Sequence, residues 1–494
     1  MPNYDIVNPD PAALVESLRA FGYTTSTAIA DLIDNSITAR AKNIWVEFYW
    51  DGPNSWIRVD DDGVGMTEDG LIAAMRPGSR SPSEERDPQD LGRFGLGLKS
   101  ASFSQCRLLT VRTRAQGKIA ARAWDLDEVA RTSEWRLQRH LQDRTERVLD
   151  QVAAGVSTTV VWENLDRVVD TRPVEDRRAQ EQFLALQAQV EDHLAMTFHR
   201  FMQRKTRPLR IWMSGHDVQP WDPFLVDEPA TQTLPVDPVS YRGLRIPIHP
   251  YVLPHHSKID KPTHQRASGP RGWNAHQGFY VYRNQRLLLP GDWLGLPLQK
   301  EEHYKLARIQ VDLPNSMDDA WHIDVKKAVA RPPGALKPDL ARIAKATREL
   351  AAGIYRHRGK QIGRRQQGGY SLVWEQRVTR DKVHYRINRD HPLVHQVRDT
   401  AVSGDTVDAL LRLVEETVPT TLITMSQNES ESAQANAFET APSDVVSVLR
   451  EVYTAMVKSG HSSREAIERL AAMEPFGRYP DAVAGLADAM ERNP

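Results

Sequence analysis

Two amphipathic helical segments precede the first strand of this chain, and this order limits the folds open to its N-terminal part. Residues 9–22 (PDPAALVESLRAFG) carry apolar residues three to four positions apart, the spacing of one helical face. Residues 24–41 begin with threonines suited to an N-cap and continue with apolar residues on one face. Two strands are expected next, over residues 44–50 and 56–60, with the turn residues Asp-Gly-Pro-Asn between them. The predicted N-terminal fold is a helical layer on a sheet, ending near residue 170.

Composition indicates a globular protein with ample core. The chain has 494 residues, enough for about three domains. Hydrophobic residues make up 40% and charged residues 26%, which excludes a disordered or collagen-like chain. No uncharged apolar stretch approaches the ~18 residues needed to cross a bilayer, and no signal peptide pattern opens the chain, so we expect a cytoplasmic protein. A single cysteine, Cys106, excludes a disulfide framework and a cysteine-rich zinc module.

Charge divides the C-terminal part of the chain into two regions. Residues 331–400 contain 16 Lys and Arg against 6 Asp and Glu, whereas residues 401–494 contain 7 against 15. The formal net charge of the whole chain is −1, so any attraction for nucleic acid must be local. We predict an α+β protein in four parts: an α/β sandwich over 1–170, an α+β domain over 171–335, a basic helix and hairpin over 336–400, and an acidic helical region over 401–494 with a polar linker near 425–443.

The first motif that could carry chemistry lies on the second expected helix, at residues 31–35 (DLIDN). Asp31 and Asn35 are four residues apart, so we expect both side chains on one helical face. A carboxylate beside an amide suits a water-activating base next to a magnesium ligand, because Mg²⁺ prefers oxygen donors. An exposed polar helix face is the alternative interpretation.

The second motif follows an expected strand directly, at residues 60–66 (DDDGVGM). Its glycines would let the backbone approach a ligand closely, and a carboxylate at the strand end can accept a hydrogen bond from an exocyclic amine. A calcium-binding loop is disfavoured, since the spaced acidic pattern and the downstream Glu of such loops are absent. A plain β-turn is the alternative.

The third motif spans residues 90–100 (DLGRFGLGLKS) and is expected to open a helix. Glycines at a helix N-terminus form an anion cradle of backbone N–H groups, to which Lys99 would add a point charge. The motif is not a Walker A loop, because Leu98 separates Gly97 from Lys99. It also lacks the directly preceding strand that a dinucleotide-binding fingerprint requires.

In this order and spacing, the three motifs resemble those of the GHKL ATPases, the superfamily of gyrase, heat-shock chaperones, histidine kinases and MutL. Residues 17–39 (SLRAFGYTTSTAIADLIDNSITA) are most similar to MORC-like and MutL-like members. The resemblance implies a Bergerat nucleotide-binding fold, with ATP and Mg²⁺ bound and with an ATP lid over residues 75–91.

The resemblance also implies roles for single residues. Asp31 would be the catalytic base, Asn35 would hold Mg²⁺, and Asp61 would bind the adenine amino group. Thr158, on a late strand, would help to seat adenine. The residues implied to contact the nucleotide are Asn35, Asp61, Gly63, Gly65, Met66, Gly92, Arg93, Phe94, Gly95, Leu96, Gly97, Lys99 and Thr158.

Asp31 departs from the family pattern, which usually has Glu at this position. The aspartate side chain is one methylene shorter, yet it can act as a general base if the helix lies closer or if a second water relays the proton. Slow hydrolysis and ATP binding without turnover are both compatible with this difference.

A weaker resemblance extends into residues 171–335, which would form a transducer-like domain. MutL-like and gyrase-like members send a lysine from this domain to the γ-phosphate of the neighbouring site. Lys326 and Lys327, within residues 321–327 (WHIDVKK), both fit that catalytic role, and residues 280–286 (YVYRNQR) precede them. A solvated basic edge strand is the alternative.

Two further groups of residues are candidate sites. His255, His256, His264 and His276 lie near one another in sequence, but no acidic or cysteine partner stands at ligand spacing, so we expect solvated loop histidines. Residues 356–365 (RHRGKQIGRR) are a basic helix end that could contact nucleic-acid phosphates or could simply be solvated.

The function predicted from this resemblance is that of an ATPase switch. It would hydrolyse ATP slowly and close as a homodimer on ATP. It would act on DNA, through residues 331–400, or on a partner nuclease or other effector, in DNA repair or antiviral defence. A protein-remodelling chaperone and a nucleotide-sensing scaffold with little turnover are the alternatives.

Overall fold

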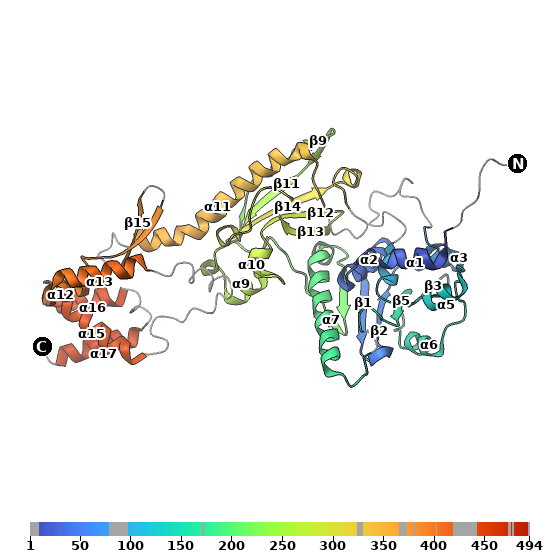
Figure 1. Cartoon of the computed structure of the whole chain (residues 1–494), viewed down its shortest axis with the longest axis horizontal. Coiled ribbons are helices and arrows are strands. Elements are labelled where there is room, and N and C mark those ends of the chain that lie inside the picture. The colour runs from blue at the N-terminus through green and yellow to red at the C-terminus, as the bar shows by residue number, and fades with distance from the viewer. Residues whose placement is uncertain are drawn as a thin grey trace. The chain divides into compact units, whose positions relative to one another are not determined.

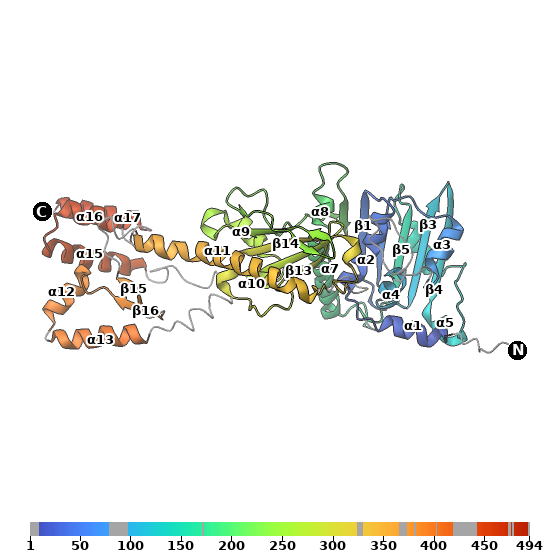
Figure 2. The ribbon, with the colours of Figure 1, turned by 90° about the horizontal axis from the view of Figure 1, so that it is seen from above.

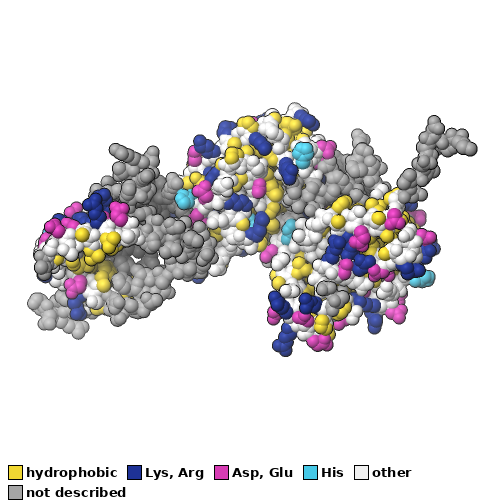
Figure 3. Space-filling model, viewed as in Figure 1, with side chains coloured by type: hydrophobic (Ala, Val, Ile, Leu, Met, Phe, Trp, Pro, Cys, Tyr) yellow, Lys and Arg dark blue, Asp and Glu magenta, His cyan; other side chains and the backbone are white. Residues whose placement is uncertain are grey.

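The computed structural model divides into two compact units, Met1–Tyr355 and Arg356–Pro494, and each is described by itself. The first unit contains two large sheets with helices packed on them and a small two-stranded sheet of β9 (Val239–Tyr241) and β10 (Leu244–Ile246) (Figures 1 and 2). Basic and acidic side chains are interspersed on the face of this unit seen in Figure 3. The structure describes residues 9–78, 97–169, 172–323, 330–364, 373–379, 382–401, 403–417, 442–472, 476 and 479–492.

The first two helices form where the sequence predicts them. Helix α1 (Pro11–Arg19) begins at Asp10, whose carboxylate accepts a hydrogen bond from the Ala13 N–H. Helix α2 (Thr25–Thr38) begins at Thr24 with a capping box. The Thr24 side chain accepts from the Thr27 N–H, and the Thr27 side chain accepts from the Thr24 N–H. Nine of the fourteen residues of α2 are buried, so this helix belongs to the core and holds its polar residues in the interior.

The first sheet has seven strands in the order β4-β3-β5-β2-β1-β6-β7. At its centre, β1 (Asn43–Tyr49) pairs antiparallel with β2 (Trp56–Asp61) and parallel with β6 (Arg210–Met213). Both strands predicted for this region are confirmed to within one residue. The other strands are β3 (Leu108–Ala115), β4 (Lys118–Asp125), β5 (Thr158–Glu163) and β7 (His216–Asp217).

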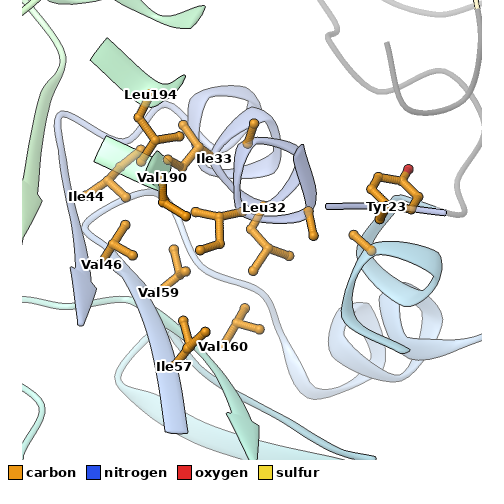
Figure 4. Close-up of a cluster of buried hydrophobic side chains, with 14 of the residues drawn as sticks. Tyr23, Leu32, Ile33, Ile44, Val46, Ile57, Val59, Val160, Val190 and Leu194 are labelled. Atoms are coloured by element: carbon orange, nitrogen blue, oxygen red, sulfur yellow. The ribbon is translucent and has the colours of Figure 1, made fainter. Parts of the chain in front are cut away.

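The core of the first sheet lies under α2 and the long helix α7 (Arg177–Thr197). Figure 4 shows Ile33 of α2, Ile44 of β1 and Val190 of α7 in one cluster of buried apolar side chains. Burying an aliphatic side chain of this size contributes ~1.5–3 kcal/mol. The remaining helices of this part are α3 (Glu68–Met75), α4 (Gly97–Phe103), α5 (Leu126–Thr132), α6 (Asp143–Asp150) and α8 (His199–Met202).

The second sheet of the first unit has five strands in the order β13-β12-β14-β11-β8 and a hydrophobic core of its own. Helix α11 (Lys337–Arg364), the long basic helix expected from the sequence, packs Leu340 and Ile343 into that core. Strands and helices of this part are β8 (Gln232–Thr233), β9 (Val239–Tyr241), β10 (Leu244–Ile246), β11 (Ile248–Val252), α9 (Lys261–Ser268), α10 (Gly272–Ala275), β12 (Gly278–Arg283), β13 (Arg286–Asp292) and β14 (Ala307–Leu313).

The second unit is mainly helical, as predicted, and the α+β class of the whole chain is confirmed. The polar linker predicted near 425–443 lies outside the described residues except for its last two positions, which begin a helix. No helix among the described residues is long and apolar enough to cross a membrane. The elements are β15 (Trp374–Thr379), β16 (Lys382–Ile387), α12 (Pro392–Thr400), α13 (Gly404–Glu416), α15 (Pro442–Lys458), α16 (Ser463–Ala472) and α17 (Pro480–Arg492).

Two buried histidines predict how stability depends on pH. His199 shares a hydrogen bond of 2.8 Å with the Tyr282 hydroxyl, and His276 shares one of 3.2 Å with the Tyr280 hydroxyl. Burial lowers the pKa of His199 to about 4 and that of His276 to about 2. The folded protein therefore keeps both rings neutral, while the unfolded chain takes up protons once the pH falls below about 6.5. Stability is lost as the pH falls, by about 1.4 kcal/mol for each histidine between pH 8 and pH 5.5.

Chemical unfolding of a His199→Gln variant at several pH values measures this contribution. We expect the loss of unfolding free energy between pH 8 and pH 5.5 to be about 1.4 kcal/mol smaller than in the unchanged protein. The matched control is His216→Gln, because His216 is exposed on β7. An identical pH dependence in all three proteins would contradict the burial of a neutral His199.

Candidate nucleotide-binding site

Asp61 ends β2 and is, with Asp60, one of two buried carboxylates of the second motif. Its side chain is 6% exposed, and its two oxygens accept hydrogen bonds from the Ser36 hydroxyl and the Gly63 N–H, each at 2.9 Å. The Ser157 hydroxyl lies 3.4 Å from the oxygen that also receives the Gly63 N–H. Burial raises the pKa of Asp61 above its ordinary value, and these hydrogen bonds partly offset the shift.

The turn after Asp61 fits tightly against its neighbours. A Cβ at Gly63 would lie 2.7 Å from the Ala39 carbonyl oxygen, and a Cβ at Gly65 would lie 2.0 Å from the Arg114 carbonyl oxygen. Gly65 also has φ +65°, in the left-handed region that glycine adopts most easily. The Met66 N–H then donates to the Thr113 hydroxyl at 2.8 Å. Glycine is required here for close packing of the turn against α2 and β3.

Thr158 stands beside this turn because of the strand register. It lies opposite Asp61 on β2 and opposite Thr113 on β3, and its side chain is 9% exposed. The hydroxyls of Thr158 and Thr113 are 3.5 Å apart. The structure therefore brings Thr158, from a distant part of the sequence, next to three predicted residues of the second motif: Asp61, Gly65 and Met66.

The two residues singled out on α2 differ in burial. Asp31 is 3% exposed, and its Oδ2 atom accepts a hydrogen bond of 2.7 Å from the Tyr23 hydroxyl. A Cβ on Gly97, the first residue of α4, would lie 3.5 Å from the same oxygen, so the backbone of the third motif passes next to Asp31. Asn35, one turn along the helix, is exposed. The first and third motifs are thus neighbours at Asp31.

Lys99 is buried within the domain, with its side chain directed at helix α3. The residue is 2% exposed, and its ammonium group donates to the Ala74 carbonyl oxygen at 2.8 Å. Burial lowers the pKa of Lys99 to about 8. In this arrangement Lys99 links the start of α4 to the end of α3, the two elements that border the predicted lid.

Several predicted residues lie outside the described part of the chain. They are Gly92, Arg93, Phe94, Gly95, Leu96, Lys326, Lys327 and the lid positions from 79 onward. The described residues contain no group of three or more His, Cys, Asp and Glu side chains able to hold a metal ion. One expectation for the histidines is wrong: His276 is buried, because its ring packs against Trp221 and bonds to Tyr280.

The site also contains residues that the sequence alone does not identify. Arg286 of β13 donates from Nε to Asp34 at 2.9 Å and lies 3.8 Å from Asp31. Arg286 and Asp34 are 252 positions apart, so no local pattern links them. Tyr23, from the loop before α2, Ser36 of α2, and Ser157, the residue before β5, also join the site.

A comparison with family models identifies the domain that carries these residues. Residues 23–159 match the family described as Histidine kinase-, DNA gyrase B-, and HSP90-like ATPase. This part of the chain is a GHKL ATPase domain. The resemblance predicted from the three motifs is confirmed for this domain, which holds Asp31, Asp61 and Thr158.

Curated relatives are similar to a part of the chain and not to the whole chain. ATPase morc-1 of Caenorhabditis elegans is 32% identical over 95 residues, 19% of this chain and 11% of that protein. DNA mismatch repair protein MutL of Thermoanaerobacter sp. is 33% identical over 96 residues, 19% of this chain and 16% of that protein. Chaperone protein HtpG of Pseudoalteromonas translucida is 35% identical over 79 residues, 14% of this chain and 12% of that protein. In each case the aligned segment covers less than a fifth of the relative.

The donors and acceptors of the GHKL domain fit an adenine nucleotide. An ionised carboxylate offers about four acceptor positions. Asp61 uses one on Oδ2, toward the Ser36 hydroxyl, and one on Oδ1, toward the Gly63 N–H, while the Ser157 hydroxyl donates most closely to the Gly63 carbonyl oxygen, at 2.7 Å. An acceptor position on Oδ2 therefore remains for an exocyclic amine. The exposed amide of Asn35 provides an oxygen of the kind that Mg²⁺ prefers.

Proposed function

We propose that the protein is an ATP-dependent switch, in which the GHKL domain binds Mg-ATP, hydrolyses it slowly and closes against a second copy of the chain. The observation that carries the proposal is the Asp61 carboxylate, which is buried at the end of β2, oriented by the Ser36 hydroxyl and the Gly63 N–H, and still able to accept from an amine. Thr158 and Met66 border the same point and would flank the adenine ring.

Asp31 would act as the general base for hydrolysis. A water molecule would attack the γ-phosphorus while its proton passes to the Asp31 carboxylate, and the bond to the β-phosphate oxygen would break, giving ADP and phosphate. Tyr23 holds one oxygen of Asp31 by a hydrogen bond of 2.7 Å. Mg²⁺, bound through Asn35, would neutralise phosphate charge. The shorter reach of aspartate supports slow turnover, since a base must lie within hydrogen-bond distance of the water.

The second sheet would transmit the state of the nucleotide. In this proposal Lys326 or Lys327 reaches the γ-phosphate, so that only ATP gives the closed arrangement. Residues 331–400, with 16 basic against 6 acidic residues, would contact DNA phosphates, because such a local excess attracts nucleic acid even when the whole chain is nearly neutral. DNA repair or antiviral defence, together with a partner nuclease or other effector, would be the setting of that activity.

A chaperone is the second candidate, and the similarity to HtpG, named a chaperone protein, is the observation that favours it. A switch that acts on DNA should hydrolyse ATP faster when duplex DNA is present. A chaperone should respond to unfolded protein instead. A nucleotide-sensing scaffold should bind ATP and respond to neither.

Phosphate release from Mg-ATP, measured with and without duplex DNA, tests the proposal. We expect slow turnover that duplex DNA raises several-fold. An Asp31→Asn variant should lose at least about tenfold in kcat, because an amide cannot take the proton, while its ATP affinity stays within about threefold. ATP hydrolysis that Asp31→Asn leaves unchanged would contradict the assignment of the base. Absence of ATP binding would contradict the proposed function.

A further inference from the structure

An arginine from the second sheet reaches the helix that carries the proposed base. The Arg286 Nε atom donates to Asp34 on α2, with distances of 2.8 and 2.9 Å to its two carboxylate oxygens. The Arg286 Nη2 atom lies 3.8 Å from Oδ1 of Asp31, three residues earlier on α2. The three side chains are 4%, 1% and 2% exposed, so the whole group is shielded from water.

Because these side chains are shielded from water, the energy of the contact between Arg286 and the two aspartates changes strongly with small movements. Charged groups in the interior attract each other more strongly than at the surface, and a carboxylate that loses its partner there costs several kcal/mol. The Tyr23 hydroxyl holds the Oδ2 atom of Asp31, while Arg286 faces its Oδ1 atom. The Asp31 carboxylate is thus contacted by one group from the GHKL domain and one from the second sheet.

The position of Arg286 is determined by the second sheet. Arg286 is the first residue of β13, and its Nη1 atom donates to the Leu287 carbonyl oxygen. Its guanidinium lies 5.8 Å from the centre of the Phe198 ring. Tyr282 and Leu287, on the same hairpin, are buried in the core of the first sheet. A shift of this hairpin would therefore move the guanidinium relative to α2.

We propose that Arg286 is a positioning residue of the ATPase site, through which the second sheet controls the Asp31 carboxylate; this inference rests on the proposed function. When the hairpin is seated on α2, Arg286 holds Asp34 and orients Asp31 for proton transfer. When the hairpin moves, Asp31 loses that orientation and hydrolysis slows.

Steady-state kinetics of Arg286→Gln tests the inference. We expect kcat to fall about tenfold while the affinity for ATP, measured by displacement of a fluorescent ATP analogue, changes by less than threefold. Arg286→Lys keeps a positive charge but loses the planar fork of donors, so it should recover part of the lost kcat. Asp34→Asn should reproduce the loss, and the double variant Asp34→Asn with Arg286→Gln should lose little more than either alone.

A second buried arginine provides the matched control. Arg348 of α11 is 11% exposed, contacts Gln299 and Glu301, and stacks over the Tyr304 ring at 3.8 Å. Its replacement in Arg348→Gln removes a buried arginine from the same part of the protein without touching α2. We expect this variant to keep kcat within about twofold of the unchanged protein, even where its melting temperature falls as far as that of Arg286→Gln.

The possible results separate this inference from the proposed function. If Arg286→Gln keeps its kcat while the unchanged protein hydrolyses ATP, the inference is wrong and the proposed function stands. If Arg348→Gln and Arg286→Gln lose kcat equally, Arg286 has a structural role only, and the inference is again wrong. If the unchanged protein binds no ATP, the proposed function fails, and the positioning role fails with it.

Discussion

Replacing Asp61 by asparagine is expected to weaken ATP binding by at least about a hundredfold, a loss of ~2.7 kcal/mol of binding free energy. An acceptor position of Asp61 remains on Oδ2, the oxygen that also accepts from Ser36. In Asp61→Asn one oxygen becomes an NH₂ group. If the oxygen stays at the Gly63 N–H, the NH₂ group would face the adenine amine, and two donors would then oppose each other. Isothermal titration with Mg-ATP or with a non-hydrolysable analogue measures the loss.

The fold should tolerate this replacement. Burial raises the pKa of Asp61, so the ionised carboxylate is less stable in the folded protein than in water. A neutral amide removes that cost and can still accept from Gly63, so the melting temperature should stay the same or rise. The affinity for GTP provides an internal control: guanine carries an oxygen where adenine carries its amine, and Asp61→Asn should reduce the preference for ATP over GTP. Unchanged ATP binding in a folded Asp61→Asn protein would contradict the site.

Local sequence patterns are sufficient to predict the helix and the strands that carry the first two motifs of the site. The N-cap threonines and the apolar face of α2, and the β-branched runs of β1 and β2, predict those elements within a few residues. Helix α7 is not predicted, although its buried residues Phe183, Val190 and Leu194 lie seven and four positions apart, the spacing of one helical face. Strand β6 pairs with β1 across more than 160 positions of sequence, and no local pattern indicates such a pairing.

In the site, too, contacts within one motif can be predicted from the sequence, whereas contacts between distant residues cannot. Asp61 and Gly65 stand in one short motif, so their proximity follows from a single turn. Ser157 joins them across 96 positions, and Arg286 joins Asp34 across 252, through strand register and the packing of the second sheet. Sequence motifs can predict which residues would contact the nucleotide. The groups that orient them depend on tertiary structure, and this is why the positioning role of Arg286 emerges from the structure alone.

Replacing Gly65 by alanine is expected to be the most destabilising single change in the turn after β2, by about 3 kcal/mol of unfolding free energy. A non-glycine residue at φ +65° is strained by ~1 kcal/mol. The new Cβ would also lie 2.0 Å from the Arg114 carbonyl oxygen, a backbone atom of β3 that cannot rotate away. Relief of this overlap requires a shift of the turn or of β3, at a cost of ~1–3 kcal/mol. Urea unfolding of the full chain measures the difference.

A Gly117→Ala variant separates the cost of backbone strain at positive φ from the cost of the steric overlap. Gly117 has φ +75° in the turn between β3 and β4, yet a Cβ there would meet nothing within 4 Å. Gly117→Ala should therefore lose only the ~1 kcal/mol of backbone strain, and its ATP affinity should not change. Gly65→Ala should lose about 2 kcal/mol more than this control and should also bind ATP more weakly, because the turn carries Met66 and begins two residues from Asp61. Equal losses of unfolding free energy in the two variants would mean that β3 accommodates the added methyl group. The close approach of Gly65 to Arg114 would then not be the reason for glycine at this position.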